Sequence, residues 1–280
     1  MGDSSFVISF PGGNKVKLNL CLSLAIGVLF AGVFNRAAIA AEEKLILFGG
    51  GAYTPAAIAK FVSFAGGKKA RIVILPWATS EPIPEFKELE EQLAGYEPAS
   101  VIRGLAPDSA SFNKGELLHQ LETATGIFFP GGDQIDLMER INKHPEIRDL
   151  LLRIYHNGVV FAGYSAGTAI ASKTMITGRG NFSVIDPTEV ETGEGLGLVT
   201  KFIIDQHFIV RQRQNRLMSV LQVSSESLGM GIDEGMALLV ENEVKGTVIG
   251  NGYVMVFRRQ KSPTRFTVDL LKNNQTILIP

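Results

Sequence analysis

Residues 158–172 read GVVFAGYSAGTAIAS and join an apolar run to a run of small residues. The apolar residues 159–162 are typical of a strand that is buried on both faces. Gly163 and Gly167 lie two positions either side of Ser165, a spacing that allows a sharp turn from strand to helix. Such a turn exposes the serine hydroxyl beside unpaired backbone N–H groups, which can stabilise an oxyanion. The stretch therefore predicts a nucleophilic serine, and a serine that only caps the helix is the alternative.

Short apolar runs alternate with helical patterns on both sides of this stretch. This alternation predicts the α/β fold class, with a mostly parallel sheet covered by helices on both faces. The apolar runs predict strands at residues 44–48, 71–75, 126–129 and 159–162, and helices are expected from Pro55, over 83–96, from Asp133 and over 147–155.

The C-terminal part of the chain has a different pattern. Residues 230–257 contain short apolar runs separated by tight turns, such as the glycine-rich turn at 250–252. These runs predict an antiparallel extension of the same domain. No internal repeat or low-complexity linker interrupts the chain, so residues 41–280 are expected to form a single α/β domain.

Residues 1–40 are predicted to be a cleavable signal peptide. Lys15 and Lys17 precede the apolar stretch 18–34, and Ala38-Ile39-Ala40 fits a small-residue cleavage site. The alternative is a retained membrane anchor, but the stretch is near the lower limit for spanning a bilayer. We expect cleavage after Ala40, no stable membrane anchor afterwards, and a secreted or periplasmic protein.

Composition excludes several kinds of function. The net charge of −1 and the absence of long single-sign runs argue against a nucleic-acid partner. The one cysteine, Cys21, lies in the leader, so the mature chain has no disulfide and no thiolate metal site. No His-x-x-x-His pattern predicts a metal site, and no cofactor is expected.

Three glycine-rich turns follow predicted strands, at residues 49–51, 131–132 and 163–167. None has a nucleotide-binding spacing. Ligands of open α/β sheets bind beyond the C-terminal ends of the strands, so these turns are expected to converge on one crevice.

A serine nucleophile needs a base and a carboxylate that orients the base. Of the four histidines, only His207 directly follows an apolar strand pattern, at residues 202–204. Asp233 and Glu234 follow a second apolar run and supply the acid. The resulting order Ser, His, Glu differs from the Ser, Asp, His order of α/β-hydrolases. The alternatives are a partly buried structural histidine and a polar turn before Gly235.

Arg211, Arg213 and Arg216 form the densest cationic cluster of the chain. In a helix, Arg213 and Arg216 would share a face. Guanidinium groups beside a candidate base are suited to bind substrate carboxylates or to hold the site together. A solvated helix face is the alternative.

Four segments together carry a resemblance to a known family. They are residues 129–134 (FPGGDQ), 163–167 (GYSAG), 205–208 (DQHF) with the three arginines that follow, and 231–234 (GIDE). In this order they resemble the serine-peptidase family of the cyanophycinases and the aspartyl dipeptidases (peptidase E). The resemblance spans residues 44–257. It implies a flavodoxin-like sheet related to class I glutamine amidotransferases, with serine in place of their cysteine, and a homodimer.

The resemblance also implies roles for individual residues. Ser165 would be the nucleophile, His207 the general base and acid, and Glu234 the carboxylate that orients His207. The backbone N–H groups of Gly132 and Ala166 would bind the oxyanion. The substrate pocket would be formed by Gln134, Asp205, Gln206, Arg211, Arg213 and Arg216.

The resemblance, together with the leader, implies an exported serine exopeptidase acting on cyanophycin, a polyaspartate with arginine on its side-chain carboxyls. The products would be β-Asp-Arg dipeptides. Two alternatives stay open: an exported aspartyl or isoaspartyl dipeptidase of the same family, and a non-catalytic periplasmic binding protein for acidic ligands. Tyr164 departs from the small residue or threonine usual before the serine, which could narrow the pocket.

Overall fold

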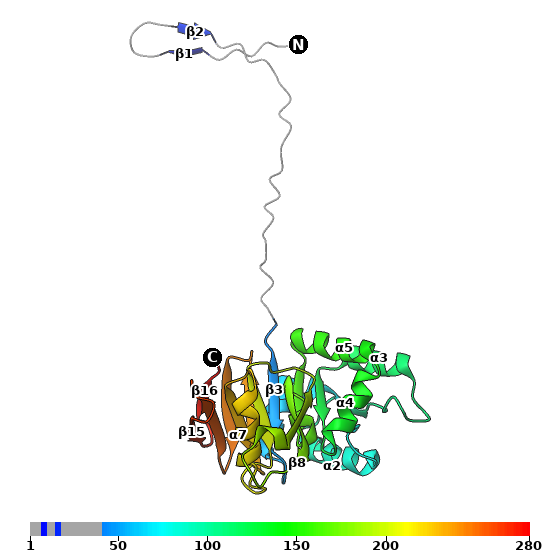
Figure 1. Ribbon diagram of the computed structural model, residues 1–280. Helices are drawn as coiled ribbons and strands as arrows, with labels where there is room; N and C mark the ends of the chain where they lie inside the picture. Colours follow the sequence, from blue (N-terminus) through cyan, green and yellow to red (C-terminus); the bar gives the residue numbers. More distant parts are fainter. Residues whose placement is uncertain (1–6, 10–14, 18–40) are drawn as a thin grey trace. The chain divides into compact units, whose positions relative to one another are not determined.

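The computed structural model describes residues 41–280 and two short segments, residues 7–9 and 15–17 (Figure 1). The chain divides into two units, Met1–Ile39 and Ala40–Pro280. In the first unit, β1 (Val7–Ser9) pairs antiparallel with β2 (Lys15–Lys17). The apolar stretch and the cleavage site of the predicted signal peptide lie outside the described residues, so the signal peptide remains a prediction.

An eight-stranded sheet lies at the centre of the second unit, with the order β16-β13-β12-β3-β7-β6-β4-β5. From the β5 edge inward, the strands lie in the order β5-β4-β6-β7-β3. If β4 is counted as the first strand, the first four strands have the order 2-1-3-4, which is that of flavodoxin-like sheets. The fifth place is taken by β3, which comes before β4 in the chain. The predicted mostly parallel sheet is confirmed. Its parallel strands are β3 (Lys44–Phe48), β7 (Val160–Tyr164), β6 (Gly126–Phe129), β4 (Arg71–Ile74) and β5 (Ser100–Arg103).

The predicted antiparallel strands at the C-terminus are present, but they are divided between two sheets. β12 (Met236–Glu241) and β13 (Lys245–Gly250), together with β16 (Thr276–Leu278), extend one edge of the central sheet. The predicted runs at the two ends of residues 230–257 belong to a second sheet instead. Because β12 pairs directly with β3, the turns after β3 and before β12 are neighbours at the same end of the sheet.

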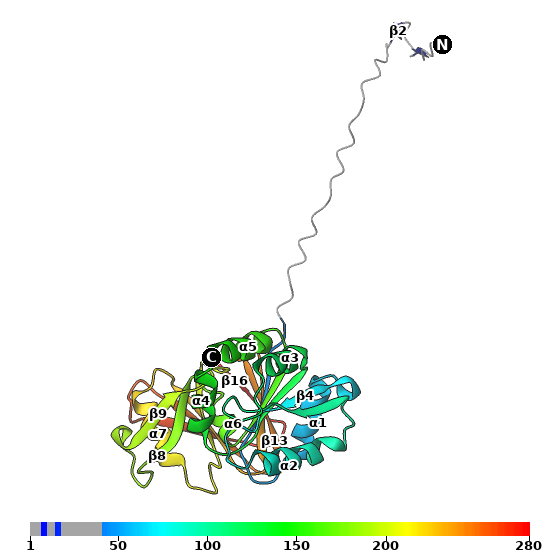
Figure 2. The ribbon, with the colours of Figure 1, turned by 90° about the vertical axis from the view of Figure 1, so that its right-hand side faces the viewer.

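A second sheet contains the strand before His207. Its order is β10-β11-β14-β15, with β10 and β11 parallel and the other pairs antiparallel. The strand of His207 is thus not part of the central sheet. A two-stranded sheet of β8 and β9 lies near α7 (Figure 2). The bounds are β8 (Thr174–Gly180), β9 (Val190–Glu194), β10 (Phe202–Gln206), β11 (Leu228–Ile232), β14 (Val254–Arg259) and β15 (Phe266–Leu271).

Helices cover both faces of the central sheet because successive strand residues point to opposite faces. Ile46 and Phe48 of β3 pack with α1 and α2, whereas Leu45 and Leu47 pack with α3, α4 and α5. The helices are α1 (Pro55–Phe64), α2 (Pro82–Ala94), α3 (Lys114–Thr123), α4 (Gln134–Asn142), α5 (Pro145–His156), α6 (Ala166–Ala169) and α7 (Gln214–Val223), with 3₁₀ turns at Gly67–Lys69 and Pro187–Glu189.

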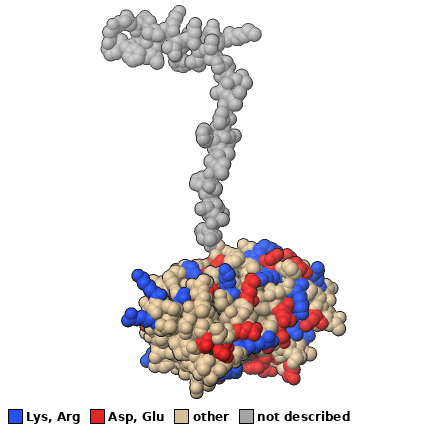
Figure 3. Space-filling model, in the orientation of Figure 1, with Lys and Arg blue, Asp and Glu red and all other residues tan. Residues whose placement is uncertain are grey.

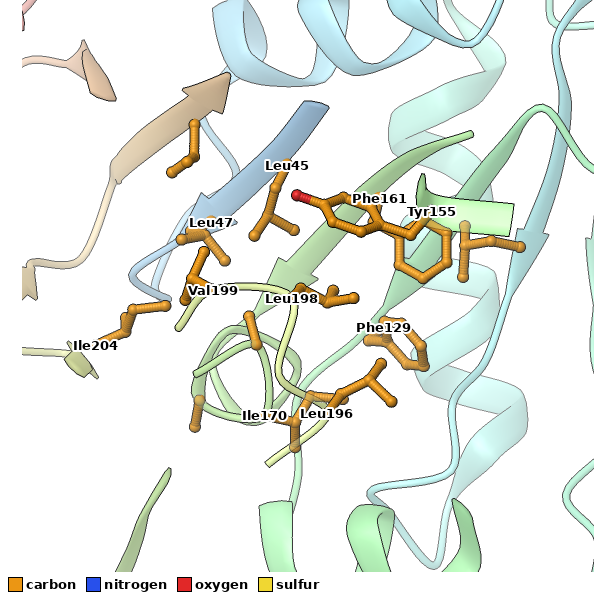
Figure 4. Packing of buried hydrophobic residues seen from close by; sticks show 14 of the residues in the cluster. Leu45, Leu47, Phe129, Tyr155, Phe161, Ile170, Leu196, Leu198, Val199 and Ile204 are labelled. Atoms are coloured by element: carbon orange, nitrogen blue, oxygen red, sulfur yellow. The ribbon is translucent and has the colours of Figure 1, made fainter. Parts of the chain in front are cut away.

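The larger core cluster joins the central sheet to the second sheet. In Figure 4, Phe129, Phe161 and Tyr155 lie near one another, with ring centroids of Phe161 5.3 Å from Tyr155 and 6.0 Å from Phe129. Ile204 of β10 belongs to the same cluster. Each fully buried side chain of this size contributes about 1.5–3 kcal/mol, so the two sheets are held firmly against each other. This packing fixes β10, which leads to His207, against β7, which leads to Ser165.

Two further properties of the described part of the chain are the charges on its surface and the length of its helices. On the face shown in Figure 3, acidic and basic side chains are interspersed. None of the described helices is both long and apolar enough to cross a bilayer.

Candidate active site

The turn between β7 and α6 has the sharp geometry that the sequence predicts. Ser165 has φ 51° and ψ −106°, a left-handed conformation that costs free energy for a residue with a side chain. Neighbouring backbone leaves room only for glycine on both sides. A Cβ at Gly163 would lie 2.2 Å from the carbonyl oxygen of Gly167, and one at Gly167 would lie 2.0 Å from that of Phe129.

Ser165, His207 and Glu234 form one hydrogen-bonded relay. Ser165 Oγ lies 2.8 Å from His207 Nε2, and His207 Nδ1 lies 2.5 Å from Glu234 Oε1. A carboxylate accepts only, so Nδ1–H donates to Glu234 and leaves Nε2 to accept the serine proton. In this arrangement the imidazole can take the proton of Ser165 while Glu234 stabilises the charge that forms. The structure thus brings together the three residues to which the sequence assigns these roles.

The glycine turn after β3 holds the relay. The N–H of His207 donates to the carbonyl of Gly49 at 2.8 Å, and that of Gly235 donates to Gly50 at 2.8 Å. A Cβ at Gly50 would lie 2.1 Å from His207 Cε1. The imidazole therefore fills the place of a side chain at position 50, and the turn converges with the serine turn at one site.

The environment keeps His207 neutral. Burial lowers the pKa of the imidazole below its ordinary value. The hydrogen bond to Glu234 raises the pKa, and the nearby cations Arg211 and Arg213 lower it, with a net lowering. A neutral imidazole is the form that accepts a proton, so this environment suits a general base near neutral pH.

The two adjacent acids have different tasks. Asp233 Oδ1 accepts hydrogen bonds from the N–H groups of Ile209 and Val210, at 2.9 and 3.0 Å. Asp233 therefore holds the turn that follows His207, and Glu234 orients the imidazole. The sequence places both carboxylates at this point but does not assign the turn-holding task to Asp233.

The turn after β6 presents a free N–H group. The N–H of Gly131 donates to Glu85 Oε1 at 3.1 Å, and that of Asp133 donates to the carbonyl of Ala78 at 2.6 Å. Within the described part of the chain, the N–H groups of Gly132 and Ala166 have no acceptor. These are the two groups predicted to bind the oxyanion, and both are available to do so.

Among the predicted pocket residues, Arg211 is the most exposed. Its side chain is 54% exposed, and its Nε lies 3.9 Å from Glu234 Oε1. Arg213 donates to the carbonyl of Gln206 at 2.7 Å, and burial lowers its pKa to about 10, so it stays cationic near neutral pH. The buried Gln134 donates through Nε2 to two carbonyls of β8, those of Ile176 and Thr177. The buried side chain of Gln206 lies at the end of β10.

Asp205 and Arg216 require a correction. Their side chains are 0% and 1% exposed and pair with each other: Arg216 Nε donates to Asp205 Oδ2 at 2.8 Å, and Arg216 Nη2 donates to Asp205 Oδ1. Two desolvated charges in a paired geometry have no surface left for a ligand. They do not line the pocket but join α7 to β10, and the ring of Phe182 lies 4.9 Å from the guanidinium.

Tyr164 ties the serine strand to the glycine turn. Its hydroxyl donates to the carbonyl of Gly51 at 2.5 Å, and its ring lies 4.6 Å from that of Tyr53. Burial, with smaller effects of Glu88 and Glu85, raises the pKa of Tyr164 to about 12. The phenol thus remains a donor across the working range of most enzymes.

Taken together, the sheet with its serine turn and the relay define an α/β enzyme with a serine nucleophile. The described residues contain no group of three or more His, Cys, Asp or Glu side chains placed to hold a metal ion. The comparison with known proteins gives the particular family. The profile of peptidase family S51 matches residues 45–248. The chain belongs to this family.

Named relatives come from both branches that the sequence resembles. A cyanophycinase from Synechococcus elongatus is 31% identical over 196 residues, which cover 70% of this chain and 61% of that protein. A peptidase E from Streptomyces coelicolor is 27% identical over 163 residues, which cover 55% of this chain and 64% of that protein. The chain thus spans less than two thirds of the length of either relative.

A solved structure supports the fold. The crystal structure of a peptidase from an acI-B1 Actinobacterium superposes with a TM-score of 0.67 at 21% identity, over 84% of this chain and 96% of that one. At this identity the likeness concerns the fold alone.

Proposed function

We propose that this chain is an exported serine exopeptidase that hydrolyses cyanophycin to β-Asp-Arg dipeptides. The observation that carries the proposal is the relay of Ser165, His207 and Glu234 in a chain of peptidase family S51. The similarity to a cyanophycinase supports the choice of substrate.

The reaction follows from the geometry of the relay. His207 Nε2 takes the proton of Ser165 Oγ, which attacks a backbone carbonyl carbon of the polyaspartate. The N–H groups of Gly132 and Ala166 stabilise the tetrahedral oxyanion. His207 then gives its proton to the leaving amine as the C–N bond breaks. Water, deprotonated by His207, attacks the acyl-enzyme, the ester C–O bond breaks, and His207 returns the proton to Ser165 Oγ as the acyl product leaves with a new carboxylate.

The charges around the site support a substrate that carries both signs. The exposed guanidinium of Arg211 is suited to a substrate carboxylate. A cavity of ≈ 660 Å³ adjoins Glu234, and Tyr53, Asn251 and Asn273 are among the other residues that line it. It offers room and a negative charge for an arginyl branch. A polyaspartate with arginyl branches meets both requirements.

The second candidate is an aspartyl or isoaspartyl dipeptidase of the same family. The similarity to a peptidase E supports it. The two candidates share the relay and differ in the length of the substrate. Membership of peptidase family S51 counts against a non-catalytic binding protein.

One assay separates the two candidates. The purified protein is incubated in parallel with insoluble cyanophycin, with free α-aspartyl dipeptides and with free β-aspartyl dipeptides, and the products are read by mass spectrometry. Our proposal predicts β-Asp-Arg from the polymer and little cleavage of the free dipeptides. Cleavage of the dipeptides with an untouched polymer would establish the dipeptidase instead.

Export and dimerisation are further parts of the proposal. The leader pattern in residues 1–40 supports export, which is tested by expressing the full chain and sequencing the N-terminus of the protein outside the cytoplasm. A new N-terminus at Ala41 is expected, and a cytoplasmic, uncut chain would contradict export.

The homodimer is tested by light scattering coupled to size-exclusion chromatography, where a monomeric mass would contradict dimerisation.

A further inference from the structure

In the turn at residues 131–133, two of the three backbone N–H groups donate hydrogen bonds within the chain. The first and third are tied to the chain segment that leads into and forms α2: Gly131 donates to Glu85 and Asp133 donates to Ala78. In the described structure the middle group, on Gly132, stays free. The two outer hydrogen bonds thus bracket the N–H that the proposed reaction needs.

Glu85 is well placed for its share of this task. It lies in the first turn of α2 and is partly buried. Burial raises the pKa of its carboxyl, and the hydrogen bond from Gly131 opposes that rise. A Cβ at Gly131 would lie 3.3 Å from the ring of Tyr164 and 3.6 Å from Glu85 Oε1. Gly131 therefore lies between the residue before the nucleophile and the carboxylate of Glu85.

We propose that Glu85 is a positioning residue for the oxyanion site, because its carboxylate holds Gly131 and thereby fixes the N–H of Gly132. The inference rests on the proposed function, since it assigns a role in the same reaction. Glu85 itself touches neither the nucleophile nor the reacting carbonyl.

The physical reason is the freedom of two consecutive glycines. Glycine has more accessible backbone states than any other residue, so a Gly131-Gly132 pair needs external contacts to hold one conformation. Gly132 has φ +131°, and a Cβ there would lie 1.9 Å from the carbonyl oxygen of Ala78. Ala78 thus fixes one side of the turn and Glu85 the other. A misplacement of about 1 Å at such a donor can reduce the rate about 100-fold.

The test compares three variants of the full chain on the substrate that the wild type cleaves. Glu85→Ala removes the acceptor, Glu85→Gln keeps an oxygen acceptor without the charge, and Glu88→Ala alters an exposed acid one helical turn away. We expect Glu85→Ala to lower kcat roughly 10- to 100-fold with KM changed less than about 3-fold. Glu85→Gln should keep kcat within about 3-fold of wild type, and Glu88→Ala should match wild type.

A second readout separates positioning from folding. The affinity for a peptide boronate, which forms a tetrahedral adduct on the serine, should fall in Glu85→Ala by the same factor as kcat. Thermal midpoints are recorded for all variants. If Glu85→Ala unfolds, the test uses the kcat of folded Glu85→Gln. A loss of 10-fold or more in that kcat overturns the inference.

The inference is also overturned by a folded Glu85→Ala with kcat near that of wild type. Failure of the proposed function gives a different result. In that case the wild type cleaves none of the aspartyl substrates, whatever stands at position 85.

Discussion

The imidazole of His207 occupies the space that a side chain at Gly50 would need. A Cβ at position 50 would lie 2.1 Å from His207 Cε1 and 2.5 Å from Nε2. Gly50 also has φ +112°, which residues with a side chain rarely adopt. The glycine turn after β3 and the base of the relay are thus built to fit each other.

Gly50→Ala is therefore expected to displace His207 and to reduce kcat at least about 100-fold. Gly67→Ala is the matched control, because Gly67 has φ +60° with open space around the added methyl. Both substitutions carry backbone strain of about 1–3 kcal/mol, visible in urea denaturation. Only the first should lower kcat, and equal activities of the two variants would contradict the account.

The glycine turns show what the sequence could predict. Gly163 and Gly167 flank Ser165 in the chain itself, so the sharp turn could be predicted from their spacing alone. That the turn at 49–51 meets the same site could also be expected, because both turns follow strands of one parallel sheet. Its contact with His207 could not, since it depends on how the second sheet packs.

A pH profile tests the protonation of His207. Activity should fall as the pH decreases through the pKa of His207, because the protonated imidazole cannot accept the serine proton. Burial holds this pKa below its ordinary value. The acidic limb of kcat/KM should therefore lie below the range of an exposed histidine.

Two substitutions should move that limb in opposite directions. Glu234→Gln removes an interaction that raises the pKa of His207, so the limb moves to lower pH and kcat falls roughly 100- to 10,000-fold. Arg211→Ala removes a cation that lowers the pKa, so the limb moves to higher pH. Shifts of the same sign would show that another group controls the profile.

Substitution of Asp205 or Arg216 should lower the free energy of unfolding more than it changes substrate binding. Arg216→Ala leaves the buried carboxylate of Asp205 without its bidentate partner, and we expect a loss of about 3–5 kcal/mol in the free energy of unfolding. Urea denaturation measures this loss. Arg179→Ala, at an exposed pair with Glu191, is the control and should change stability by less than about 0.5 kcal/mol. Unchanged stability with a raised KM in Arg216→Ala would instead make Arg216 a substrate contact.

This pair marks a limit of sequence reasoning. Charged residues after an apolar strand resemble a site whether they face a ligand or each other. Asp205 and Arg216 meet only because α7 folds back over β10, and that arrangement has no local signal. The second sheet escaped prediction for the same reason, since the apolar run at 202–204 looks like a strand of the central sheet. Glu85 could not be singled out from the sequence, because its helix also contains Glu88, Glu90 and Glu91.

Tyr164→Phe should show how much the hydroxyl of Tyr164 contributes to stability apart from its ring. The variant loses the hydrogen bond to the carbonyl of Gly51 but keeps the ring beside Tyr53. We expect a loss of about 1 kcal/mol in stability, measured by urea denaturation, and a kcat within about 10-fold of wild type. A gain of stability would show that the hydroxyl is not tied to the turn.

The most direct measurement compares wild type with Ser165→Ala on insoluble cyanophycin, with soluble products identified by mass spectrometry. The account predicts β-Asp-Arg dipeptides from the wild type and a rate at least about 1,000-fold lower from the variant, with an unchanged thermal midpoint. Release of the dipeptide by folded Ser165→Ala at a rate near that of wild type would contradict the assignment of Ser165 as the nucleophile.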